Sequence, residues 1–257
     1  MAGNERKIAE FLLQNKGVIS LPHVELVTDI GNIVSGKYKP ITHVEHIDEV
    51  MTEDAKKKAD IYINQEGVSV KQSGGSFSFN RLQRANILGL LTHLNITNPN
   101  ERLTCLDQGV ADFHTGAVLN RNRDWQDFFN EDDFKILLNY LMMIGSPNHK
   151  NSSNPATYIL TGPANGITMQ NIKFQTFDEY FNDHKNYFKI AIRRQWVGQA
   201  SKSEHKRALG FTKKVDNAPW VFNNVAGAPD SGWQDAASWD PNKRKTAYFL
   251  MIELINH

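Results

Sequence analysis

Three residues that flank one turn have the types of side chain that enzymes use for chemistry on phosphates. In "ADIYINQEGVSVK" (59–71), Asp60 precedes the turn, and Ser69 and Lys71 follow it as a Ser-x-Lys triplet. A carboxylate is a preferred ligand of Mg²⁺, and a lysine beside such a cation can hold a phosphate or activate a water molecule. The spacing therefore predicts a site for metal-assisted phosphodiester hydrolysis. The alternative is a surface ion pair across two strands, which contributes little to stability.

These side chains need a β-hairpin to bring them together. "DIYI" and "VSVKQ" read as strands, and we expect "NQEG" (64–67) to form a four-residue turn that places Asp60 opposite Lys71. Side chains alternate along a strand, so the hairpin has an aliphatic face and a polar face. The polar face holds Asp60, Tyr62, Ser69 and Lys71.

The composition places the chain among ordinary globular proteins. Of its 257 residues, 40% are hydrophobic and 22% are charged, which argues against disorder. We see no apolar run long enough to cross a membrane and no signal-peptide pattern, so we expect a cytoplasmic protein without membrane partners. The single cysteine, Cys105, excludes a disulfide framework and a cysteine-based zinc site.

The apolar pattern along the chain predicts an α/β (α+β mixed) fold with a central mixed sheet flanked by helices. We expect a first helix over 5–14 capped by Asn4, a loop over 72–79, a helix over 80–95, and a helix or helix pair over 125–145. Strand-like segments dominate after residue 155. We therefore divide the chain into a core with the hairpin (1–150) and a strand- and loop-rich region (151–257), packed as one unit.

Positive charge is concentrated in residues 185–214. Nine lysines and arginines stand there against one acid, Glu204, although the whole chain carries a formal charge of only +1. Such a segment attracts phosphates, and arginine and glutamine are side chains that read base edges. Nucleic acid is therefore the expected partner, and a solvated basic face without a ligand is the alternative.

The hairpin resembles the active site of the PD-(D/E)XK nuclease superfamily, best known from type II restriction endonucleases. The motif stands as "AD" (59–60) and "SVK" (69–71). Ala59 replaces the proline of that motif, and Ser69 replaces its acidic residue. The resemblance implies Mg²⁺ bound by Asp60 and the Val70 carbonyl, with Ser69 beside the metal and Lys71 activating the water. The missing carboxylate would come from Glu25, Glu10 or Glu49, with Glu25 as a metal ligand.

The C-terminal part is similar to small restriction enzymes that cut four-base sites, which implies sequence-specific binding of double-stranded DNA. The resemblance also implies a cognate DNA methyltransferase as a genetic partner, and either a monomer or a homodimer. The alternatives are a repair or junction-cleaving nuclease and a non-catalytic DNA-binding protein. The expected DNA-contacting residues are Gln72, Ser73, Ser76, Asn80, Arg81, Arg84, Arg193, Arg194, Gln195, Lys202, Lys206, Lys213, Lys214, Lys243 and Arg244.

Overall fold

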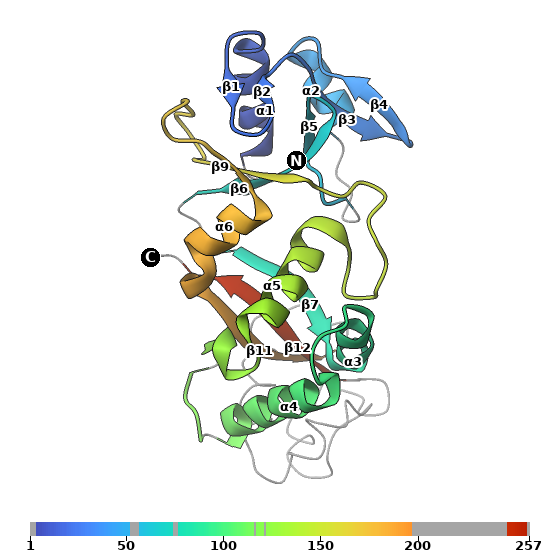
Figure 1. Cartoon of the computed structure of the whole chain (residues 1–257), viewed down its shortest axis with the longest axis vertical. Helices are drawn as coiled ribbons and strands as arrows, with labels where there is room; N and C mark the ends of the chain where they lie inside the picture. The colour runs from blue at the N-terminus through green and yellow to red at the C-terminus, as the bar shows by residue number, and fades with distance from the viewer. Residues whose placement is uncertain are drawn as a thin grey trace, which may run out of the picture.

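The computed structural model describes residues 4–51, 57–73, 77–115, 117–120, 122–196 and 246–255. Two main β-sheets lie one beyond the other along the long axis of the molecule (Figure 1). The mixed α/β class expected from the sequence is confirmed. The α-helices of the described residues are α1 (Glu5–Gln14), α2 (Glu45–Val50), α3 (Arg84–His93), α4 (Pro99–Thr115), α5 (Glu131–Asn139) and α6 (Phe177–His184).

The first main sheet contains the hairpin in its interior. Its six strands lie in the order β10-β9-β6-β5-β3-β4, and every neighbouring pair is antiparallel except β6 with β9. A separate pair, β1 (Ser20–Leu21) and β2 (Glu25–Leu26), lies apart from it. The strands of the six-stranded sheet are β3 (Ile30–Val34), β4 (Lys37–Pro40), β5 (Ile61–Ile63), β6 (Glu66–Gln72), β9 (Tyr158–Gly162) and β10 (Lys173–Thr176).

The β5–β6 hairpin turns over two residues. Asn64 and Gln65 both have positive φ angles, 49° and 70°, and Ile61 pairs with Val68. Two successive left-handed residues characterise a type I′ turn, whose twist matches that of the flanking strands. The predicted four-residue turn is therefore wrong.

The predicted register is also wrong, and Asp60 does not lie directly opposite Lys71. The turn is tighter because the Asn64 side chain is held by the neighbouring segment. Its oxygen accepts from the backbone N–H groups of Thr28 and Asp29, and its nitrogen donates to the carbonyls of Val24 and Leu26. The register differs from the expected one by two residues, so every side chain keeps the predicted face.

The two faces of the six-stranded sheet contribute to different hydrophobic cores. The aliphatic side chains of the hairpin pack under α1 and α2, where Ile8, Leu12 and Ile47 are fully buried. On the opposite face Ala59 and Tyr62 join a larger core built from α3 to α6 and the second sheet. The predicted separation into an aliphatic face and a polar face is confirmed, and the polar face lies toward the interior of the molecule.

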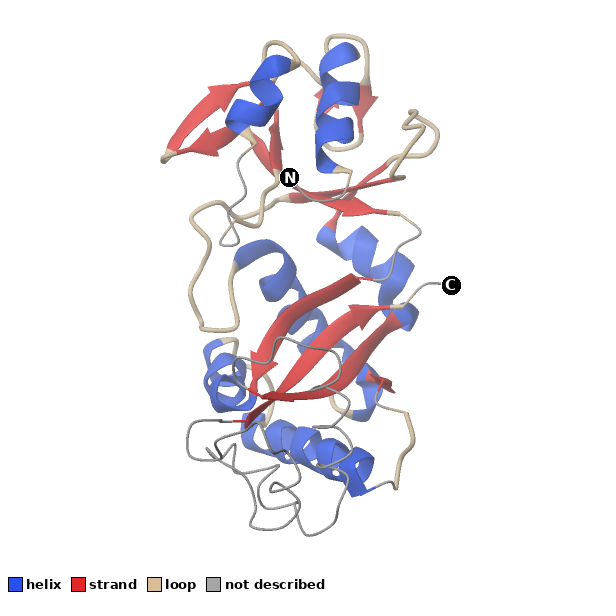
Figure 2. Ribbon diagram, turned by 180° about the vertical axis from the view of Figure 1, so that it is seen from behind, coloured by secondary structure: helices blue, strands red, loops and turns tan. Residues whose placement is uncertain are grey.

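The second main sheet has the strand order β7-β12-β11-β8, and α5 and α6 cover one of its faces (Figures 1 and 2). Its strands are β7 (Phe77–Gln83), β8 (Asn122–Asp124), β11 (Phe188–Trp196) and β12 (Thr246–Leu254). The expected loop over 72–79 and helix start at residue 80 are wrong, because 77–83 forms a strand. Pairing with β12 outweighs the helical pattern there, and Leu82 becomes buried opposite Leu250.

The bounds of α1 agree with the prediction, but the role of Asn4 does not. Its side chain makes no capping bond and instead donates to the Gly162 carbonyl at 2.6 Å, which ties the helix to β9. Helices α4 and α6 were not anticipated. The start of α6 is fixed by a capping box in which the Thr176 and Glu179 side chains satisfy each other's backbone N–H groups.

Each main sheet contains strands from both sides of residue 150 in the sequence. Strands β9 and β10 extend the sheet that contains the hairpin, and β7 pairs with β12. The two regions expected from the sequence therefore share their sheets. Across the residues that the structure describes, none of the helices combines the length and apolar character required to cross a membrane.

Candidate active site

The polar face of the hairpin joins Asp60, Ser69 and Lys71 in one cluster, which we call the Asp60–Lys71 cluster. The Lys71 Nζ donates to Ser69 Oγ at 2.6 Å and lies 3.9 Å from Asp60 Oδ2. The same Asp60 oxygen accepts from the Val70 N–H at 2.7 Å and from Ser69 Oγ at 3.3 Å. Ser69 therefore bridges the acid and the base, and Lys71 is held close to the carboxylate despite the altered register.

The position of β6 explains why the cluster is partly shielded. This strand lies between β5 and β9, so Ser69 is only 1% exposed, whereas the Asp60 and Lys71 side chains remain 26% and 20% exposed. Behind the cluster, the buried Asn32 side chain donates to the Asp60 carbonyl at 3.3 Å. The two charged groups thus sit on a rigid strand pair and still reach solvent, as a group that meets a substrate must.

A second lysine belongs to this site, and the sequence analysis missed it. The Lys58 Nζ donates to the Leu141 carbonyl at 2.7 Å, in the π-helical turn that follows α5. The pKa of Lys58 is lowered to about 8, chiefly by burial and in part by the positive charge of Lys71, while the charge of Asp60 opposes the shift. A signal was available, because Lys58 stands two residues before Asp60, and alternation in an extended chain would place both side chains on one side.

The three glutamates proposed to supply a second carboxylate lie elsewhere. Glu10 forms an ion pair with Arg6 on α1, which packs on the aliphatic face of the hairpin, and Glu49 belongs to α2 on that same face. Glu25 is exposed in β2. Within the described residues, no hydrogen bond or ion pair links any of them to Asp60.

The donors available to a metal ion at the cluster are few. They are the Asp60 carboxylate, the Val70 carbonyl and Ser69 Oγ, and Lys71 Nζ already donates to the last two. Among the residues the structure describes, no group of three or more His, Cys, Asp or Glu side chains is placed to hold a metal. This donor set fits Mg²⁺ only if the ion keeps most of its ligands as water or substrate oxygens, which magnesium commonly does.

The residues near the hairpin that we expect to contact DNA follow the Asp60–Lys71 cluster in the sequence and belong to several elements. Gln72 and Ser73 are exposed at the end of β6, and the Ser73 N–H donates to the Gly162 carbonyl. Asn80 and Arg81 lie in β7, and Arg84 begins α3. Ser76 lies outside the described residues.

The structure covers only the beginning of the basic segment. Lys185 pairs with Glu131 at 2.7 Å, and Lys189 pairs with Asp124, so acids from elsewhere in the chain neutralise part of the charge excess. Arg193, Arg194 and Gln195 lie in β11, paired with β12. The remaining expected DNA-contacting residues, Lys202, Lys206, Lys213, Lys214, Lys243 and Arg244, lie outside the described ranges.

Comparison of the chain with protein-family models, with curated proteins and with solved structures finds no match.

Proposed function

We propose that the protein is a Mg²⁺-dependent endonuclease that hydrolyses phosphodiester bonds of double-stranded DNA at specific sequences, as type II restriction enzymes do. The observation that carries the proposal is the approach of Lys71 Nζ to within 3.9 Å of Asp60 Oδ2 on a partly buried hairpin face. An acid and a lysine in this arrangement supply both a ligand for a hard cation and a charge for the phosphate.

Each member of the cluster has a distinct role in this proposal. Asp60 and the Val70 carbonyl would hold Mg²⁺, which when bound polarises the phosphodiester and increases the acidity of a water molecule. Lys71 orients the attacking water and balances the charge that develops on the phosphate. Ser69 positions Lys71 through the 2.6 Å hydrogen bond, and Lys58 adds a second positive charge to the site.

The wider fold supports the same proposal at a coarser level. A six-stranded mixed sheet holds the hairpin in its interior, with helices on both faces, as in the core that the resemblance implies. Sequence recognition would fall to the later segments, where Arg193, Arg194 and the distal lysines offer donors for base edges and phosphates. A methyltransferase that protects the host sites and a monomeric or dimeric assembly remain part of the proposal.

A second candidate function is DNA binding without cleavage. The observation that favours it is the imbalance of charge at the cluster, where Lys58 and Lys71 accompany the single carboxylate of Asp60. Two cations and one acid suit a phosphate contact better than a multi-ligand metal centre.

A digest distinguishes these possibilities. The chain is incubated with mixed-sequence duplex DNA and Mg²⁺, and discrete fragments are expected from the endonuclease. Lys71→Ala and Asp60→Asn should each lower the cleavage rate at least about 100-fold, since both groups act at the reacting phosphate. Lys39→Ala, an exposed lysine on β4 of the same sheet, is the matched control and should cut normally.

Three other outcomes would contradict the proposal. Shifted but intact DNA would identify a non-catalytic binder. Structure-dependent nicking would instead indicate a repair or junction nuclease. Normal cleavage by both cluster variants would place the chemistry elsewhere in the chain.

A further inference from the structure

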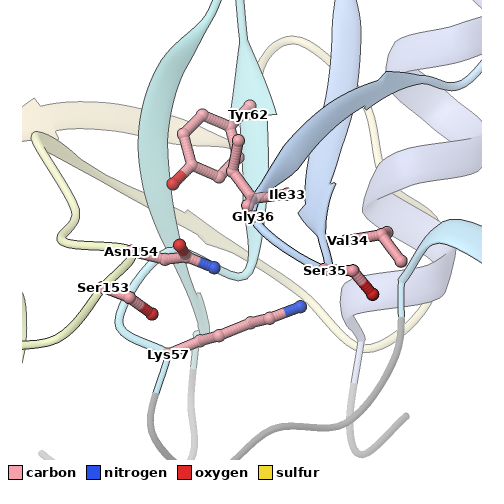
Figure 3. Close-up of a pocket in the computed structure, with 8 residues that line it drawn as sticks. All are labelled: Ile33, Val34, Ser35, Gly36, Lys57, Tyr62, Ser153 and Asn154. Carbon is pink, nitrogen blue, oxygen red and sulfur yellow. The ribbon is translucent and has the colours of Figure 1, made fainter.

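A pocket of about 560 Å³ opens beside β5 and the residues that precede it, and it is lined by Lys57 and Tyr62 among others (Figure 3). The turn between β3 and β4 forms one side of it, and the segment before β9 forms the other. Asn154 links the pocket to the cluster, because its carbonyl accepts from the N–H groups of both Lys58 and Ala59 at 3.0 Å. The lining residues are Ile33, Val34, Ser35, Gly36, Lys57, Tyr62, Ser153 and Asn154.

Lys57 gives this pocket a positive charge that no acid among its described lining residues balances. Its Nζ is shielded from solvent and has no hydrogen-bond partner within the described residues. Figure 3 shows its side chain extending across the pocket toward Ser35. The lining residues that the structure describes include no acid. A shielded ammonium without a partner is costly, so the site favours an anion that supplies the missing acceptors.

The rest of the lining suits an anion attached to a larger, flatter group. Tyr62 and Asn154 are buried, whereas Ser35, Gly36 and Ser153 are exposed and leave the pocket open to solvent. Gly36 has φ +75°, and a Cβ there would meet nothing within 4 Å, so the entrance is not crowded. Burial raises the pKa of the Tyr62 hydroxyl, which therefore remains a donor at neutral pH.

We propose that this pocket binds a nucleotide through its phosphate, with Lys57 as the counter-charge, the Ser153 and Asn154 side chains as further polar partners, and Tyr62 as a flat wall. The volume lies in the range of small-molecule sites, and lysine is a common point-charge partner of phosphate. The phosphate belongs either to a free mononucleotide or to the end of a DNA strand. The inference goes beyond the proposed cleavage, because binding here requires neither Mg²⁺ nor the chemistry at Lys71.

Calorimetric titration of the full chain in EDTA tests the proposal. The probes are deoxyadenosine 5′-monophosphate, deoxyadenosine, inorganic phosphate, and one oligonucleotide with and without a 5′-phosphate. We expect the mononucleotide to bind at least tenfold more tightly than the nucleoside or free phosphate. Lys57→Met should weaken it at least tenfold, Lys57→Arg should retain most of the affinity, and Lys39→Met should change nothing.

The source of the phosphate follows from the oligonucleotide pair. Tight binding of the 5′-phosphorylated strand alone would assign the pocket to DNA ends, and tight binding of the mononucleotide would assign it to free nucleotides. Equal affinities of the wild type and Lys57→Met would overturn the proposal. So would the absence of binding by every phosphorylated nucleotide, or inorganic phosphate binding as tightly as the nucleotide. A chain that cuts no DNA and still shows the Lys57-dependent binding would refute the endonuclease and leave the pocket intact.

Discussion

The charges of the hairpin are placed by contacts with residues far along the chain. Lys58 reaches the carbonyl of Leu141, and Lys57 enters a pocket that Ser153 and Asn154 help to line. Two adjacent lysines therefore have different environments: one is hydrogen-bonded to backbone and near another cation, and the other is shielded and unpaired within the described residues. The anion proposed above would give Lys57 Nζ the acceptor that no described residue supplies.

Lys58 makes the stability of the protein depend on pH in a defined direction. Its pKa of about 8 in the folded chain lies below the value of 10.5 expected when the chain is unfolded. Between these values the unfolded state binds more protons, so stability rises with pH. The unfolding free energy of the wild type minus that of Lys58→Met should grow by on the order of 1 kcal/mol from pH 7 to pH 9.5.

Urea unfolding at a series of pH values measures this difference, with Lys39→Met as the control that should show no such trend. Tyrosines begin to ionise in this range in the unfolded chain, but they do so in the wild type and in the variant alike and therefore cancel in the difference. A constant difference would mean that Lys58 keeps an ordinary pKa.

The sequence was sufficient to place Asp60, Ser69 and Lys71 on one face of the hairpin, because side chains alternate along two short strands. It did not reveal Lys58 or Lys57, whose roles depend on segments some 80 to 100 residues away. The sequence also gave no correct position for Glu10, Glu25 and Glu49, the three glutamates proposed to supply a second carboxylate. Nothing in local sequence indicates that α1 and α2 pack on the aliphatic face, away from Asp60.

At the scale of single elements, the turn of the hairpin determines the geometry of the site. Asn64 and Gln65 occupy left-handed conformations, which ordinary side chains adopt at a cost. We expected all four residues of "NQEG" (64–67) to form the turn, whereas Glu66 and Gly67 belong to β6. The two-residue turn is instead favoured by the Asn64 side chain, which forms hydrogen bonds with backbone groups of residues 24–29. A tertiary contact thus overrode local turn chemistry.

Substitutions in this turn should have opposite effects on stability. Gln65→Gly should raise the unfolding free energy by about 0.5–1 kcal/mol, because glycine adopts positive φ without strain. Asn64→Ala should lower it by about 2–3 kcal/mol, because several backbone groups lose their partner. Urea midpoints measure both effects. Destabilisation by Gln65→Gly would contradict the two-residue turn.

Strand β7 illustrates the same limit on prediction. Residues 80–95 have a helical apolar pattern, but the strand continues through Gln83 because β12 provides a pairing edge. The helix begins only where that pairing ends, at Arg84. The helical pattern of the sequence predicted the helix and its C-terminal half correctly. The start of the helix depends on the pairing of β7 with β12, more than 160 residues away.

At the scale of the whole molecule, the chain passes between its sheets more than once. Strand β6 belongs to the six-stranded sheet and β7 to the four-stranded sheet, although only a short connection separates them. Strands β9 and β10 return to the first sheet before β11 and β12 complete the second. The hydrophobic core between the sheets contains residues from both. The two sheets are therefore expected to unfold together.

Division of the chain at residue 150 should abolish folding of the first part. A fragment of residues 1–150 lacks β9, which pairs with β6 over five residues, and β12, the only partner of β7 in the described sheet. Circular dichroism in increasing urea should show no cooperative transition for the fragment and a single one for the intact chain. A cooperative transition in the fragment would show that the first half is an independent domain.

The late position of β12 has a consequence for how the protein is made. About 170 residues separate Phe79 from its partner Ile252. During translation β7 therefore remains unpaired until most of the chain has been synthesised. During that interval its phenylalanines and its unpaired backbone remain available to other nascent chains. Newly synthesised protein should accordingly depend on chaperones that shield exposed strands, and rapid overexpression should favour inclusion bodies more than the stability of the finished molecule would suggest.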